Sequence, residues 1–296
     1  MRKLLLKGCG TALVTPFRGG KIDEEAYIRL VLRQVESGVD FLVPLATTGE
    51  TPALDAGEKL RLLRLAREQA AGLPLLCGCG SNSVSGTVAN IRALEGEGAD
   101  AWLVVVPFYN KPTQQGQYDY FRAIADETDK PIVIYNVPGR TGVNMEASTV
   151  LRLADDCPQI IGIKEASGRF SQASEIIRCA PETFSVLSGD DDLTFPIMAA
   201  GGQGVISVAS NAAPAEVTQM TGALLEGDFL KAREWHHRLS PLFKACFVES
   251  NPIPVKAAME CLGLCSREVR LPLSPATQAT VETMKAALEN VTRENY

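Results

Sequence analysis

Short apolar runs of residues that favour β-strands recur eight times along the chain, and polar or glycine-containing turns follow them. The runs centre on residues 11–14, 41–45, 73–77, 102–106, 132–135, 160–163, 184–187 and 205–208. Several of them are nearly continuous rather than alternating, which is typical of strands that are buried on both faces of a parallel sheet. The pattern therefore predicts eight parallel strands.

Segments with helical periodicity lie between these runs, and two of them have recognisable ends. Asp23 can cap a helix that runs to Glu36, with Gly38 shortly after its end. Asp55 and Glu58 have the spacing of a capping box at the start of another helix. Strands that alternate with helices predict an α/β protein, and eight such units favour a (β/α)8 TIM barrel. A doubly wound open sheet is the alternative, but the chain lacks its G-x-G-x-x-G phosphate loop.

The remainder of the chain differs from the barrel region, because helical patterns there are interrupted by prolines. We expect residues 1–230 to form the (β/α)8 barrel catalytic domain and residues 231–296 to form a C-terminal helical extension. No low-complexity linker separates the two parts, so one domain with an appendage is the better description.

Composition narrows the class of protein. The chain is 46% hydrophobic and 22% charged, as ordinary globular proteins are. A net charge of −6 argues against nucleic acid or an anionic membrane as the main partner. No apolar run is long enough to span a bilayer. The N-terminal MRKLLLKG has too short an apolar stretch for a signal peptide, so we expect a cytoplasmic location.

Metal-ligating residues are scarce. The two histidines, His236 and His237, are adjacent in a helical stretch, which argues against most metal sites and against Ser-His-Asp catalysis. The eight cysteines show no C-x-x-C spacing, so we expect reduced, buried thiols. Three consecutive acids at 190–192 suggest a divalent metal at first sight. Without histidines or further clustered acids, we interpret them as helix-capping and surface residues.

Lys164 directly follows the apolar run 160–163. In a TIM barrel the chemistry lies at the carboxyl ends of the strands, which is where this lysine falls. Burial disfavours the charged form of an amine, and a neutral amine is a nucleophile for carbonyl carbons. The ordinary alternative is a lysine that reaches past the strand end to water or pairs with a carboxylate.

Other strand ends carry complementary groups. Tyr135 ends the fifth run and can transfer protons, and Arg140, between glycine and threonine, can bind a carboxylate in a bidentate manner. Thr47 and Thr48 begin a turn whose amides and hydroxyls suit a carboxylate. Taken alone, each has an ordinary structural interpretation: Tyr135 as a core aromatic, Arg140 as a surface arginine, and Thr47 with Thr48 as a polar turn. Their combination with Lys164 predicts a catalytic site.

Five motifs carry a family resemblance. They are Thr-Thr-Gly-Glu at 47–50, Tyr-Asn-Lys-Pro-Thr at 109–113, Tyr-Asn-Val-Pro-Gly-Arg-Thr-Gly at 135–142, Ile-Lys-Glu-Ala at 163–166 and Leu-Ser-Gly-Asp-Asp at 187–191. With them the chain resembles the pyruvate-dependent class I aldolases and lyases related to N-acetylneuraminate lyase, and among these the dihydrodipicolinate synthases. The resemblance extends over essentially the whole chain.

The resemblance implies a mechanism for condensing pyruvate with L-aspartate 4-semialdehyde, on the diaminopimelate route to lysine. Lys164 would form a Schiff base with pyruvate, and neither a metal nor another cofactor would be needed. Thr48 and the amide of Thr47 would hold the pyruvate carboxylate. Tyr135, Thr47 and Tyr109 would form a proton relay.

The resemblance also assigns the second substrate and the assembly. Arg140 would bind the carboxylate of aspartate semialdehyde, while Gly189 and the carbonyl of Ile206 would shape the site around Lys164. Family members assemble as homotetramers, dimers of dimers in which Tyr109 completes the neighbouring subunit's site. No nucleic acid or membrane partner is implied.

One departure concerns feedback inhibition by lysine. Sensitive relatives bind lysine with histidines and a glutamate, whereas the matching positions here hold Ala56, Lys59 and Gly86. The ammonium of a bound lysine would lose its carboxylate partner and face an added positive charge. We therefore expect weak or absent inhibition by lysine.

Three alternative functions remain to be compared. A sister lyase would cleave N-acetylneuraminate or a 2-keto-3-deoxy sugar acid through the same lysine, and Arg140 argues against it. A catalytically inactive barrel kept for binding would be expected to lack Lys164 or its tyrosines. A metal-dependent class II aldolase would need histidine ligands.

Overall fold

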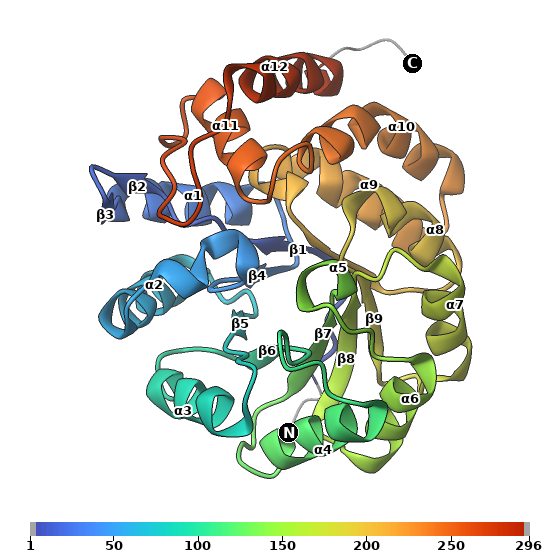
Figure 1. Cartoon of the computed structure of the whole chain (residues 1–296). Coiled ribbons are helices and arrows are strands. Elements are labelled where there is room, and N and C mark those ends of the chain that lie inside the picture. Colours follow the sequence, from blue (N-terminus) through green and yellow to red (C-terminus); the bar gives the residue numbers. More distant parts are fainter. Residues whose placement is uncertain (1–3, 293–296) are drawn as a thin grey trace.

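Eight parallel strands form the centre of the computed structural model, which describes residues 4–292 (Figure 1). They are β1 (Gly8–Ala12), β4 (Phe41–Val43), β5 (Leu76–Gly78), β6 (Ala101–Val105), β7 (Ile132–Asn136), β8 (Ile160–Glu165), β9 (Ser185–Ser188) and β10 (Gly204–Ser207). Their order is β4-β1-β10-β9-β8-β7-β6-β5, and a parallel bridge between Leu42 and Leu75 joins β4 to the start of β5. The sheet closes on itself, so the predicted TIM barrel is confirmed.

Helices cover the outside of the barrel, and a short hairpin of β2 (Phe17–Arg18) and β3 (Lys21–Ile22) follows β1. The helices are α1 (Glu24–Glu36), α2 (Ala56–Gln69), α3 (Val84–Leu94), α4 (Gln114–Ala125), α5 (Pro138–Thr141), α6 (Ala147–Asp156), α7 (Phe170–Cys179), α8 (Thr194–Ala199) and α9 (Pro214–Glu226). Both predicted helix starts are confirmed: Asp23 accepts the amide of Ala26, and Asp55 forms a reciprocal capping box with Glu58.

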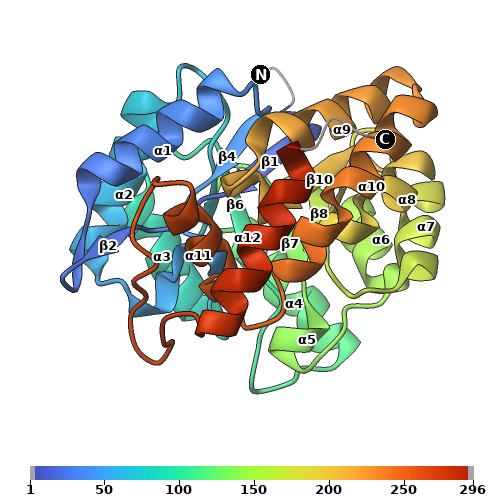
Figure 2. The ribbon, with the colours of Figure 1, turned by 90° about the horizontal axis from the view of Figure 1, so that it is seen from above.

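Three further helices follow the barrel: α10 (Phe229–Ala245), α11 (Ile253–Cys261) and α12 (Gln278–Thr292). The helix α10 packs on α9 and α12, and α12 also packs on α11 (Figure 2). The proposed division into residues 1–230 and 231–296 stays a prediction, and its boundary falls after the second residue of α10, which begins at Phe229. Residues 1–3 and 293–296, at the outer ends of the two parts, lie outside the described residues.

Two apolar clusters form the core. One lies between strands and helices and includes Cys77 and Cys79. The other fills the barrel interior, and its side chains alternate with those of the first along most strands. Its members include Phe41, Leu103 and Tyr135. Burial raises the pKa of the Cys77 thiol to about 12, so this thiol stays protonated and unreactive near neutral pH.

A β-bulge in β8 breaks the alternation at one point. Ile132 pairs with Ile160, but Val133 pairs with Gly162, so Ile161 is an extra residue on β8. Ile161 points into the barrel, and after the bulge Lys164 pairs with the inward-facing Tyr135. If the pairing continued from Ile160 without a bulge, Lys164 would lie opposite Asn136 and face the surrounding helices. The bulge is therefore what turns this lysine into the interior.

Candidate active site

Lys164 lies at the carboxyl end of β8 and is 3% exposed. Its Nζ stands 4.4 Å from the ring centroid of Tyr135, the residue beside it on β7. Among the described residues, no carboxylate lies within ion-pair distance of this Nζ. Neither ordinary interpretation holds, because the side chain reaches neither bulk water nor an acid partner. The lysine is buried next to an aromatic face and a phenol.

Asp190 and Asp191, which follow β9, lie beyond ion-pair distance of Lys164 but still interact electrostatically with it. Burial raises the pKa of the Asp190 carboxyl to about 6, with Asp192 adding to the rise and Lys164 opposing it. Asp191 is buried and accepts the backbone amides of Val208 and Ala209 at 3.0 Å each. The interpretation of all three acids as capping and surface residues was wrong for Asp191. Its carboxylate fastens the loop after β10.

Thr47 and Thr48 lie in a 3-10 turn, Thr47–Gly49, directly after β4. Thr48 is buried, whereas Thr47 is half-buried. The hydroxyl of Thr15 donates to the carbonyl of Gly49 at 2.7 Å, and Glu50 ends the turn with a φ of 53°. A left-handed conformation is unfavourable for a glutamate, so contacts of its side chain must stabilise it.

Those contacts come from the far end of the chain. Lys256 of α11 donates through its Nζ to Glu50 Oε1 at 2.8 Å and to the carbonyl of Thr15 at 2.9 Å. The amide of Arg270 donates to Glu50 Oε2 at 2.9 Å. Burial lowers the pKa of the Lys256 ammonium, and Glu50 opposes that fall. The helix α11 and the segment that follows it thus fix the backbone that presents Thr47 and Thr48.

Asn251 joins two of the predicted site residues, although sequence reasoning did not single it out. Its Nδ2 donates to Thr48 Oγ1 at 2.9 Å, and its carbonyl accepts from Nη2 of Arg140 at 3.2 Å. Its Oδ1 is buried without a partner among the described residues. The signal that could have revealed it is the Asn-Pro-Ile-Pro segment at 251–254, an unusual entry to a helix.

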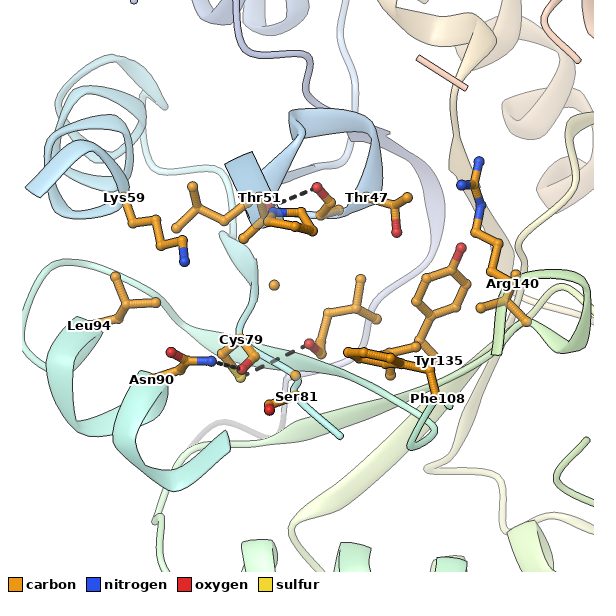
Figure 3. Close-up of a pocket in the computed structure, with 18 of the residues that line it drawn as sticks. Thr47, Thr51, Lys59, Cys79, Ser81, Asn90, Leu94, Phe108, Tyr135 and Arg140 are labelled. Atoms are coloured by element: carbon orange, nitrogen blue, oxygen red, sulfur yellow. Dashed lines mark hydrogen bonds between the residues drawn. The ribbon is translucent and has the colours of Figure 1, made fainter. Parts of the chain in front are cut away.

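A cavity of about 470 Å³ opens above the barrel. Thr47, Tyr135 and Arg140 line one end of it, and the phenol of Tyr135 points between the other two (Figure 3). Arg140 reaches this position because Pro138 begins the short helix α5, which carries the arginine back over the strand ends. The cavity therefore joins a phenol, a hydroxyl and a guanidinium within reach of one small substrate.

Lys164 and Thr48 do not line this cavity, and neither do the predicted residues Gly189 and Ile206. Gly189 donates its amide to the carbonyl of Glu165 at 2.8 Å, and a Cβ on it would lie 2.5 Å from that of Ala166. Ile206 is buried in the barrel interior, in the same cluster as Tyr135. Only glycine fits at position 189, since any side chain there would push the end of the strand that carries Lys164 outward.

Tyr109 is not brought to the site within this chain. It is 88% exposed, in the loop after β6, and its φ of 73° is unfavourable for an aromatic residue. The next residue, Asn110, donates to the carbonyl of Asn82 at 2.9 Å and ties the loop to the segment before α3. The side chain of Tyr109 is therefore available for contact with another molecule.

Comparisons with known proteins agree with this geometry. The model of the dihydrodipicolinate synthetase family matches residues 5–291. The chain belongs to this family. A 4-hydroxy-tetrahydrodipicolinate synthase from Thermomicrobium roseum is 50% identical over 285 residues, covering 96% of this chain and 94% of the relative. One from Phocaeicola vulgatus is 48% identical over 288 residues, with 97% of each chain covered.

Solved structures of the family show the same fold. The dihydrodipicolinate synthase from Thermotoga maritima superposes with a TM-score of 0.96 at 44% identity, and the match covers 97% of this chain and 99% of that one. The family resemblance read from the five motifs is thus confirmed. Within residues 4–292, no helix is long and apolar enough to cross a membrane. No group of three or more histidines, cysteines, aspartates or glutamates in that range is arranged to hold a metal ion.

Proposed function

We propose that this protein is a Schiff-base lyase that condenses pyruvate with L-aspartate 4-semialdehyde, as a 4-hydroxy-tetrahydrodipicolinate synthase. The observation that carries the proposal is Lys164, buried without an acid partner beside Tyr135 at the end of β8. Family membership and relatives of that name support the choice of reaction. We also propose that the reaction takes place in the cytoplasm and uses no metal or other cofactor.

In the first half-reaction the amine of Lys164 attacks C2 of pyruvate, and water leaves to give an iminium ion. The phenol of Tyr135, beside the nitrogen, gives a proton to the departing hydroxyl and later takes one from C3 of the adduct. Thr48 and the amide of Thr47 hold the carboxylate of pyruvate. Loss of the C3 proton gives an enamine, the carbon nucleophile.

In the second half-reaction the enamine attacks the aldehyde of aspartate semialdehyde, whose carboxylate binds to Arg140. The amino group of this substrate then attacks the iminium carbon and displaces Lys164, which closes the six-membered ring and frees the enzyme. Thr47 relays protons between Tyr135 and Tyr109. Gly189 and the carbonyl of Ile206 leave room for the adduct around Lys164.

Tyr109 requires a second copy of the chain. We propose a homotetramer, a dimer of dimers, in which Tyr109 of one subunit completes the proton relay of its partner. Its exposure and the fixed loop that presents it support this assembly. We further propose that residues 1–230 act as the catalytic domain and that 231–296 support it, with no nucleic-acid or membrane partner.

Borohydride trapping tests the chemistry. The protein is incubated with pyruvate, reduced with sodium borohydride, and examined by intact-mass analysis and peptide mapping. We expect one covalent adduct, on Lys164, in the wild type and in Lys231→Met, a control on the exposed surface of α10. We expect none in Lys164→Met. An adduct on another lysine, or no adduct at all, would overturn the mechanism.

Competition between aldehydes tests the second substrate. With pyruvate as donor, we expect aspartate semialdehyde to be consumed and sugar aldehydes to be left unreacted. In Arg140→Met the rate with aspartate semialdehyde falls by about tenfold or more, because a charge-assisted contact with the carboxylate is lost. A preference for N-acetylmannosamine would make the protein a sister lyase and leave Lys164 in its role.

Inhibition by lysine is a separate test. Ala56, Lys59 and Gly86 supply no carboxylate for the ammonium of lysine. We therefore expect half-maximal inhibition only above about 1 mM lysine, corresponding to a weak complex. Sub-millimolar inhibition would contradict this expectation.

A further inference from the structure

Ring closure requires a base close to Lys164. The amine of aspartate semialdehyde is mostly an ammonium at neutral pH, because α-amino groups have pKa values of about 8. An ammonium has no free electron pair, so it must lose a proton before its nitrogen attacks the iminium carbon. That carbon carries Nζ of Lys164, so the base must lie near this lysine. The phenol of Tyr135 is already assigned to the pyruvate half-reaction.

Three acids lie near Lys164, and the carboxylates of two of them are engaged. Asp191 is buried and accepts two amides and a hydroxyl of residues 207–209. Glu165 is also buried, and its donors include Nδ2 of Asn136 at 3.1 Å. Hydrogen bonds hold both of these carboxylates in place, so neither is free to receive a substrate.

Asp190 is the acid whose carboxylate is not engaged. It is half-buried, and within the described part of the chain no group donates to its side chain and no base lies within ion-pair distance of it. Its backbone is fixed, because its carbonyl accepts the hydroxyls of Ser188 at 2.7 Å and Thr194 at 3.2 Å. Burial raises the pKa of its carboxyl to about 6, and the charge of Asp192 adds to the rise. The carboxylate is therefore ionised at neutral pH and available as a base.

The sheet places Asp190 beside Lys164. The strands β8 and β9 pair in parallel, with Glu165 opposite Ser188. The amide of Gly189 then donates to the carbonyl of Glu165 at 2.8 Å and extends this pairing by one residue. Asp190 follows at once, at the carboxyl end of the barrel, where the chemistry of this fold takes place. Its charge interacts with that of Lys164, although the two side chains form no ion pair.

Asp190 lowers the stability of the fold at neutral pH. Its burial disfavours the ionised form, and no hydrogen bond to the carboxylate offsets that cost among the described residues. Other buried acids of this chain have such contacts, as Glu50 has with Lys256 and Asp191 has with two amides. An acid that is buried without a partner, at the end of the barrel where the reaction takes place, is typical of a catalytic group.

We propose that Asp190 is a further catalytic residue, which binds the ammonium of aspartate semialdehyde and takes a proton from it for ring closure. This proposal rests on the proposed function, because it supplies the base for the last step of that reaction. It also gives the enzyme a contact that distinguishes an amino-acid aldehyde from an aldehyde without an amine.

The protons and electrons of this step balance. Of the three protons on the ammonium, one passes to Asp190, one passes to Nζ in the diamine that forms at C2, and one stays on the ring nitrogen. The electron pair of the amine forms the new bond to C2. The bond from C2 to Nζ then breaks, and its electron pair goes to Nζ. Asp190 returns its proton there, so it ends ionised and Lys164 ends as an ammonium.

Trapping on Lys164 tests the step. Wild type and Asp190→Asn are each incubated with pyruvate and aspartate semialdehyde, reduced with borohydride, and examined by intact-mass analysis and peptide mapping. We expect kcat of Asp190→Asn to be lower by about 100-fold or more, because general base catalysis is lost. We expect Lys164 of this variant to carry the carbon atoms of both substrates, since the ammonium cannot displace it. Wild type should carry mainly the pyruvate adduct.

Two controls separate this role from a structural one. The first is 4-oxobutanoate, which is aspartate semialdehyde without the amine. It should be trapped together with pyruvate to the same extent in wild type and in Asp190→Asn. The second is Asp192→Asn, which removes the exposed neighbouring acid and should keep the wild-type kcat. Weaker trapping of 4-oxobutanoate in Asp190→Asn would mean that the whole site is distorted, and it would overturn the proposal.

The pH dependence of kcat gives a second readout. Lys164 is bonded to substrate in the complex that kcat reports on, so its amine does not titrate there. In wild type, kcat should fall as the pH drops through about 6 and Asp190 is protonated, whereas Asp190→Asn should show no such fall. The other charged groups that act on Asp190 are Asp192, Asp191 and Glu165. In Asp192→Asn the fall should move to lower pH, because a negative neighbour has been removed.

The outcomes distinguish this step from the proposed function. If Asp190→Asn keeps kcat within about threefold of wild type, the proposal is overturned, while a pyruvate adduct on Lys164 leaves the lyase mechanism in place. A low kcat with only the pyruvate adduct on Lys164 places the defect before ring closure and also overturns the proposal. Absence of a pyruvate adduct in wild type overturns the proposed function, and this step with it.

Discussion

Two lysines are buried among the described residues, and their surroundings differ in kind. Lys256 is fully buried, forms an ion pair with Glu50 at 2.8 Å, and stands 4.4 Å from the ring of Phe17. Lys164 is equally close to the ring of Tyr135 but has no acid within ion-pair distance. The ammonium of Lys256 is neutralised and held in place, whereas Lys164 has a free electron pair whenever it loses its proton. Burial makes a lysine unusual, and the absence of a counter-charge makes it a candidate nucleophile.

The largest expected effect follows from removing the lysine without a partner. Lys164→Met should lower kcat by about 10⁴-fold or more, because the covalent intermediate can no longer form. The free energy of unfolding should stay within about 1 kcal/mol of wild type or rise, since methionine buries no charge. Steady-state kinetics and urea denaturation measure the two quantities. A large loss of stability would mean that Lys164 has a structural partner after all.

Replacing Lys256, the paired lysine, should lower the stability of the protein more than its activity. Lys256→Met leaves Glu50 buried with one hydrogen-bond donor, and we expect a loss of about 3–5 kcal/mol in the free energy of unfolding. Adding Glu50→Gln to this variant should recover part of the loss, because the remaining charge is removed. Urea denaturation of both variants decides the point. If the double variant is less stable than Lys256→Met, the carboxylate of Glu50 has another stabilising partner.

The titration of Asp190 tests whether Lys164 is unpaired. Its pKa is raised from 3.8 to about 6, so the folded protein holds a proton that the unfolded chain has released. That contribution to stability is complete below about pH 4 and is lost as the pH rises through 6. Asp190→Asn should therefore gain up to about 3 kcal/mol relative to wild type between about pH 4 and pH 7.

Burial is the main cause of this raised pKa, and the charged groups that modify it are Asp192, Lys164, Asp191 and Glu165. Urea denaturation across the pH range measures it, with Asp129→Asn, an exposed aspartate in a loop, as the matched control. A flat difference between Asp190→Asn and wild type would mean that Asp190 is ionised at all these pH values. A true ion pair with Lys164 would then be the simplest cause.

Asn251 should give the smallest effect. Asn251→Ala removes the hydrogen bond to Thr48, and we expect kcat/KM to fall by about fivefold, equivalent to about 1 kcal/mol. The change should appear mainly in KM for pyruvate, because Thr48 is proposed to hold its carboxylate. The neighbouring Ser250→Ala, an exposed position, is the control. An effect on kcat alone would place Asn251 in the chemical step.

The barrel, and the placement of most candidate site residues at its strand ends, could be predicted from the sequence, because these strand ends carry residues with distinctive chemistry. Lys164, Tyr135, Thr47 and Arg140 all follow apolar runs, and parallel strands bring such ends together. The direction of Lys164 could not be predicted. The direction in which its side chain points depends on the β-bulge in β8, and a period-2 sequence pattern does not reveal a bulge.

The contacts that hold the candidate site in place also could not be predicted from the sequence. Glu50 and Lys256 are 206 residues apart, and neither has a local pattern that distinguishes a buried ion pair from two surface charges. The burial of Asp191 depends in the same way on the amides of Val208 and Ala209, in the loop after β10. The burial of such residues depends on partners that are distant in the sequence, so local periodicity cannot predict it.

The ion pair of Glu50 with Lys256 has a consequence for synthesis of the chain on the ribosome. The carboxylate is made 206 residues before the ammonium that neutralises it, a delay of about 10–40 s at ordinary elongation rates. During that time the Thr47–Gly49 turn cannot be buried in its final form without leaving Glu50 unpaired. The Thr47–Gly49 turn is therefore completed only by a chain that has been translated beyond α11.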